Sequence, residues 1–141
     1  EYTKFLISLN ETNDLEIIIE YLSNNYETII NSKDQKKIEI ILVLINFLKL
    51  EKNFNSQFSY NNIFDDRQMP SYLLIQDIKK NIDVKNDLSL FMLSLISLDN
   101  KSWTDLHPEH LLLVLNVYDL YNEGILIKPI ILEILSELEI F

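Results

Sequence analysis

Apolar residues recur at helical spacing along most of this sequence. Between residues 15 and 30 they follow the i, i+3, i+4, i+7 pattern, with polar residues on the opposite side, as in an amphipathic helix of about four turns. The same period returns further along the chain and predicts an all-α protein with about seven helices. The clearest predicted helices span residues 15–30, 38–50, 70–82, 87–99, 107–122 and 127–140.

Two of these segments, 38–50 and 87–99, are apolar almost all round, which predicts helices buried between neighbours. At about 13 residues each, they are shorter than the roughly 20 residues that a membrane span requires, so we expect no membrane span. Within residues 38–50, the polar positions Glu39, Asn46 and Lys49 lie close to one helical face, which predicts a narrow solvent-facing stripe. A buried Glu39 with a raised pKa is the alternative.

Local signals place the boundaries between the helices. Residues 52–70 lose the helical period and gather Asn, Ser and Asp, which predicts a long loop, and Pro70 suits the first turn of the next helix. Gly124 suits the end of the helix over residues 107–122, with Ile125 packing back on its last turn. Trp103, in the link after residue 99, is expected to cover one end of the core.

The predicted helices group into successive pairs near residues 14–52, 70–98 and 107–140. Stacked antiparallel hairpins would bury the apolar faces, so we expect an irregular α-solenoid or an orthogonal bundle. At 141 residues the chain fits one helical domain over residues 1–141, and its start at Glu1 suggests a part of a longer protein.

Charge and composition exclude several functions. The formal net charge of -10 disfavours phosphate backbones and anionic lipid surfaces, so we expect neither nucleic acid nor a membrane as partner. One glycine cannot build a phosphate-binding or dinucleotide-binding loop, and the chain has no cysteine for thiolate chemistry or zinc.

The sequence HPEH, residues 107 to 110, contains the only two histidines and is the best candidate for a metal site. Zinc needs three or four ligands, whereas Pro108 and Glu109 are both favoured in the first turn of a helix. We therefore interpret HPEH as a helix start. No serine has the setting of a triad nucleophile, and we predict a protein that is not an enzyme, with no catalytic residues, cofactor or metal ligands.

The stretch LYNEGILIKPIILEIL, residues 120–135, resembles the last helical hairpin of bacterial α-helical-repeat scaffold proteins of the tetratricopeptide-like type. In those proteins a helix ends in glycine and an apolar second helix carries a glutamate near its middle. The resemblance implies an interaction or scaffold role without catalytic residues.

The leading hypothesis is therefore a non-enzymatic protein-interaction or scaffold module. We expect a protein or peptide partner, and the surplus acidic residues of the C-terminal half favour a basic segment. The residues expected to contact it are Glu109, Asp119, Glu123, Glu133 and Glu137. The alternative is an all-α domain that binds a small molecule or a lipid in an apolar pocket between its helices.

Overall fold

The protein is all helical in the part of the chain that the computed structural model describes, residues 15–31, 34–48, 67 and 69–139. The all-α prediction is confirmed, with six α-helices in these ranges against about seven predicted for the whole chain. The helices are α2 (Leu15–Ile30), α3 (Gln35–Leu48), α4 (Tyr72–Asp83), α5 (Asp87–Leu98), α6 (Pro108–Leu120) and α7 (Ile127–Glu137), with 3-10 helices η1 (Trp103–Asp105) and η2 (Tyr121–Gly124). None of the described helices is long and apolar enough to cross a bilayer.

Short polar side chains begin the helices by accepting hydrogen bonds from backbone N–H groups that have no partner within the helix. Asp34 accepts from the N–H of Lys37 at 3.2 Å and begins α3. Ser71 begins α4 in the same way, which places Pro70 before the helix and not in its first turn as predicted. Asn86 begins α5. Most of the predicted loop over residues 52–70 lies outside the described residues.

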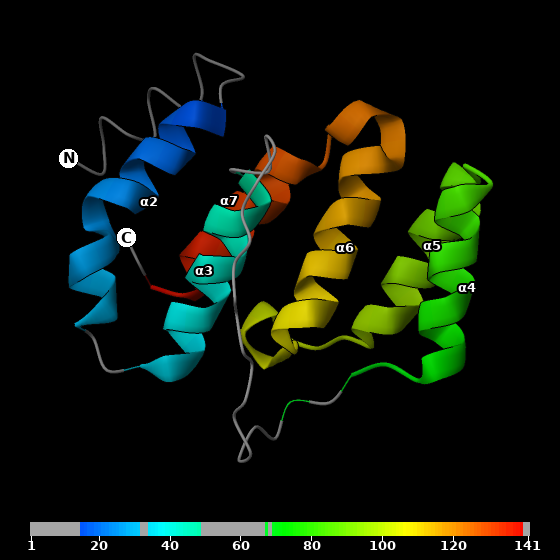
Figure 1. Cartoon of the computed structure of the whole chain (residues 1–141), viewed down its shortest axis with the longest axis horizontal. Coiled ribbons are helices and arrows are strands. Elements are labelled where there is room, and N and C mark those ends of the chain that lie inside the picture. The colour runs from blue at the N-terminus through cyan, green and yellow to red at the C-terminus, as the bar shows by residue number, and fades with distance from the viewer. Residues whose placement is uncertain (1–14, 32–33, 49–66, 68, 140–141) are drawn as a thin grey trace.

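The helices lie side by side in the spatial order α2, α3, α6, α5, α4, with α7 packed against α6 and η1. Figure 1 shows α2 and α4 at opposite ends of the molecule, and antiparallel pairs α2–α3 and α4–α5. Helix α6, from the C-terminal part of the chain, lies between these two hairpins. The hairpins therefore do not follow one another in space in their chain order, as successive units of a repeat array do.

The main core lies where α2, α3, α6 and α7 meet. Its buried side chains include Ile18, Leu44, Leu111, Leu115 and Ile131, each 0% exposed. Trp103 is half-buried against this core, as predicted. A smaller cluster, made of Ile78, Leu90 and Val117, joins α4 and α5 to α6.

The link between α6 and α7 differs from its prediction. Gly124 has a left-handed φ of 74°, and a Cβ atom there would lie 3.2 Å from the Oδ1 atom of Asp119. Gly124 ends the 3-10 helix η2 and not α6 itself. Ile125 is 63% exposed, so the prediction that it packs back on the preceding helix is wrong. Leu126, the next residue, is the one that packs against the core.

Candidate functional site

The sequence HPEH is the start of α6, as predicted. His107 is the residue before the helix, and its Nδ1 atom accepts a hydrogen bond from the backbone N–H of Glu109 at 3.3 Å. Pro108 occupies the first helical turn, where its missing N–H costs no hydrogen bond. The histidines therefore separate: His107 begins the helix, while His110 points into the protein and is 0% exposed.

His110 is held by Ser97, a residue that the sequence does not mark. The Nε2 atom of His110 lies 2.9 Å from the Oγ atom of Ser97. The single hydroxyl proton of Ser97 is donated to the backbone oxygen of Ser94, at 2.7 Å. The Ser97 oxygen is therefore the acceptor, and the geometry assigns the proton of His110 to Nε2. This bond joins the end of α5 to the start of α6.

The surroundings of His110 disfavour its charged form. Burial lowers the pKa of His110 from 6.5 to about 4, with smaller contributions from the nearby charges of Lys101 and His107. Its Nδ1 atom is buried without a hydrogen-bond partner. Because the Ser97 hydroxyl points at a backbone oxygen, histidine does not act on it as a base. Among the described residues, no three His, Asp or Glu side chains gather in positions to hold a metal ion.

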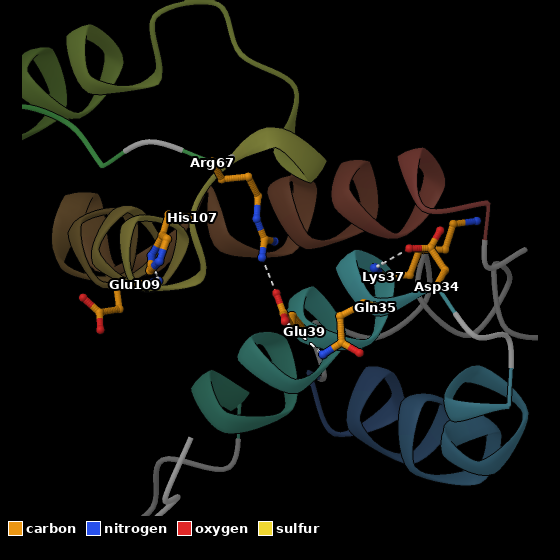
Figure 2. A network of polar contacts seen from close by, with 7 residues as sticks. All are labelled: Asp34, Gln35, Lys37, Glu39, Arg67, His107 and Glu109. Atoms are coloured by element: carbon orange, nitrogen blue, oxygen red, sulfur yellow. Dashed lines mark hydrogen bonds and ion pairs between the residues drawn. The ribbon is translucent and has the colours of Figure 1, made fainter. Parts of the chain in front are cut away.

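The only arginine of the chain, Arg67, makes a buried ion pair that the sequence pattern did not indicate. Its guanidinium contacts the Oε2 atom of Glu39 on α3, and the side chains are 3% and 12% exposed. The Oε1 atom of Glu39 accepts a hydrogen bond from Gln35 at 3.0 Å. Figure 2 shows Arg67 reaching toward Glu39 from the segment before α4.

This ion pair corrects the predicted solvent-facing stripe on residues 38–50. Glu39 turns toward Arg67, and Asn46 is half-buried with its Oδ1 atom out of contact with water. Lys49 lies outside the described residues. Helical spacing places the polar residues on one face but does not show that a distant segment covers that face.

The structure disperses the five acidic residues that the sequence indicates as a partner site. Glu109 and Asp119 are exposed at opposite ends of α6, about 15 Å apart along the helix axis. Glu133 is exposed on α7, one turn before Glu137. The side chain of Glu123, in η2, lies outside the described part of the structure. Among the four of these side chains that the structure describes, Glu133 and Glu137 are the two that lie one helical turn apart.

Glu137 makes bonds within the protein. Its carboxylate accepts hydrogen bonds from the hydroxyls of Ser102 and Thr104, and from the backbone N–H groups of Trp103 and Thr104 at 3.2 and 3.0 Å. Burial by itself raises the pKa of Glu137, but these hydrogen bonds outweigh it and hold the pKa below its ordinary value. Glu137 therefore fixes the end of α7 to η1.

An exposed apolar surface that the sequence pattern does not indicate lies on α5. The segment 87–99 was expected to be buried all round, but Leu88, Met92, Leu95 and Ile96 are 69%, 50%, 45% and 60% exposed. They follow the spacing i, i+4, i+7, i+8 and so form one face of the helix, which we name the α5 stripe. The opposite face is buried through Leu90, Ser94 and Ser97, while Phe91, at the edge of the stripe, packs against the rings of Tyr118 and Tyr121.

The charges near the α5 stripe differ from those of the rest of the chain. Residues 72–101, which contain α4 and α5, carry four aspartates and four lysines and are therefore electrically neutral. The formal charge of -10 is thus carried entirely by the other residues. The apolar stripe is accordingly set in a neutral hairpin of an otherwise acidic protein.

Comparison with known proteins gives no match among protein-family models, curated proteins or solved structures.

Proposed function

We propose that this chain is a non-enzymatic protein-interaction module, a scaffold of packed helices that contacts a partner through the α5 stripe. The observation that carries the proposal is the exposure of four large apolar side chains on one helical face. Isolated exposed apolar residues are common, but a continuous apolar face costs free energy in water unless a partner covers it. The face lies on a helix fixed to α6 by the bond between Ser97 and His110.

The acidic residues, which lie outside the α5 stripe, offer a separate contact for a basic partner. Glu109, Asp119 and Glu133 are exposed, and the formal charge of -10 would attract a basic protein or peptide from a distance. Contacts of this kind raise the association rate more than the final affinity, and salt weakens them. In this proposal Glu123 and Glu137 complete the acidic set, although the Glu137 carboxylate is already engaged.

A crosslinking experiment tests the proposal at the stripe itself. Because the chain has no cysteine, an Ile96→Cys variant can carry a photoreactive group at a single position. Illumination in an extract of the source cells should link defined proteins to this position, and excess unlabelled wild-type protein should compete. Unlabelled Ile96→Glu protein should compete poorly, because a charge cannot be buried in an apolar contact without a large cost.

The matched control carries the same group at Glu20→Cys, an exposed position on α2, which belongs neither to the α5 stripe nor to the acidic set. Identical proteins at both positions, or none at Ile96, would contradict the proposed contact surface. Native mass spectrometry of the same preparation tests the alternative function. An apolar ligand that co-purifies with the protein would favour a small-molecule or lipid binder. An unchanged mass would leave the interaction module in place.

A further inference from the structure

We infer that the α5 stripe binds a second copy of this chain, through an antiparallel pairing of the two α5 helices about a two-fold axis at Met92. The inference rests on the proposed function and names the partner of the same surface. Three features carry it: the local charge, the order of the exposed residues and the exposed area.

Local charge favours a like partner at this surface. A second copy carries the same net charge of -10, and its approach through most other surfaces is opposed by repulsion. The α4–α5 hairpin, with four aspartates and four lysines over residues 72–101, carries none of this excess. A second copy avoids this repulsion if it approaches through its own neutral hairpin. A basic partner would be drawn toward the acidic remainder.

The order of the exposed residues is self-complementary. Leu88, Met92 and Leu95 are separated by four and then three residues, the spacing with which paired helices interdigitate side chains. In an antiparallel pair centred on Met92, Leu88 of one copy lies opposite Ile96 of the other. A two-fold axis needs such a surface, because each residue must find its counterpart on an identical patch. The flexible Met92 side chain adapts to its own copy at the axis.

The exposed area sets the strength of the pairing. From the exposed fractions of its four residues, the stripe offers roughly 400 Å² per copy, about half of the roughly 800 Å² that each partner buries in an interface of standard size. We therefore expect a weak dimer whose fraction rises with protein concentration.

Sedimentation of the wild-type protein over a wide range of concentration should show this monomer–dimer equilibrium. Met92→Glu should raise the dimer dissociation constant at least about tenfold, because it places two carboxylates together at the axis. Ile125→Glu adds the same charge at an exposed isoleucine outside the stripe and should leave the dissociation constant unchanged. Circular dichroism should show equal helix content, since neither side chain is buried.

Single-cysteine variants test the antiparallel arrangement directly. Met92→Cys should form a disulfide-linked dimer under mild oxidation. Leu88→Cys and Ile96→Cys should each link poorly alone but readily when mixed, because residues 88 and 96 of different copies face each other. Glu133→Cys, exposed on α7, measures linkage by random collision.

The inference is overturned if the wild-type protein stays monomeric at every concentration, or if Glu133→Cys links as fast as Met92→Cys. Self-linkage of Leu88→Cys without mixed linkage would overturn the antiparallel pairing. Failure of this inference can be told apart from failure of the proposed function. If the protein is monomeric but the labelled Ile96→Cys position captures a different protein, the interaction module stands and the self-association does not. A monomer that captures nothing at that position would lose both.

Discussion

Apolar side chains are buried to different extents in two regions of the molecule: the region around α6 and α7, and the α4–α5 hairpin. In the first region, α6 buries Leu111, Leu115 and Tyr118 in the main core and Val117 in the smaller cluster beside α4 and α5. In the second, α5 is just as apolar in sequence but buries one face and exposes the other. Two helices of similar composition thus differ because α6 has neighbours on several sides, whereas α5 lies near one end of the row. Burial depends on neighbours, and composition alone does not supply them.

The largest expected effect separates the two regions by stability. Leu111→Ala on α6 should lower the free energy of unfolding by about 2–5 kcal/mol, because it removes buried methyl groups and leaves a cavity. Leu88→Ala on α5 should change it by less than about 0.5 kcal/mol, because that side chain is 69% exposed. Urea unfolding followed by circular dichroism, below the concentration at which dimers form, measures both. Equal losses would contradict the division into a buried and an exposed apolar helix.

The sequence predicted the helices better than their surroundings. The helical period places α2, α3 and α5 within a few residues, because it depends only on the local chain. The signals at Pro108 and Glu109 predict the start of α6 for the same reason. Exposure of the α5 stripe depends on the spatial order of the helices. Burial of Glu39 depends on the path of the chain that brings Arg67 to it. The hydrogen bond between Ser97 and His110 is equally a product of packing between helices.

The second prediction removes a link between the N-terminal helices and the chain leading to the hairpin. Arg67→Met should cost about 3 kcal/mol, because it leaves the carboxylate of Glu39, only 12% exposed, without its opposite charge. The double variant Arg67→Met with Glu39→Leu should lose less than the sum of the two single variants. Urea unfolding of the four proteins forms the double-mutant cycle. Additive losses would show that the two side chains do not interact in solution.

The third prediction uses acid to weaken the contact between α5 and α6. The pKa of His110 is about 4 in the folded protein and 6.5 in the unfolded chain, so the unfolded chain takes up its proton first as the pH falls. This group therefore leaves stability unchanged above pH 6.5 and lowers it between pH 6.5 and about 4. The expected loss is about 2 kcal/mol at pH 5, relative to pH 7.

Urea unfolding at pH 7 and pH 5 measures this loss, in a range where ordinary carboxylates stay largely ionised. His107→Gln should retain the dependence, because His107 lies at the helix start and not in the core. His110→Gln should remove it. If this variant does not fold, proton NMR of the wild-type protein gives the same answer, since a His110 signal that titrates near 6.5 would contradict the prediction.

The smallest effect distinguishes two acidic residues on the same helix. Glu137→Ala should lower the free energy of unfolding by about 1 kcal/mol at pH 7, because its carboxylate holds η1 through hydrogen bonds with Ser102, Trp103 and Thr104 at the protein surface. Glu133→Ala, one turn earlier and exposed, should change it by less than about 0.5 kcal/mol. Thermal unfolding compares the two variants. Because both replace glutamate by alanine, the change in helix propensity is the same in each.

The pH dependence of this difference has a definite sign. The folded-state pKa of Glu137 lies below its ordinary value of 4.5, so its contribution is complete above that pH and is lost as the pH falls through the folded-state pKa. The two variants should therefore differ at pH 7 and converge in strong acid. If they instead differ equally at both, the hydrogen bonds of the charged carboxylate are not the cause. Partner binding is better tested at Glu133, whose removal leaves the fold intact. A loss of binding in a Glu137 variant could also result from displacement of η1.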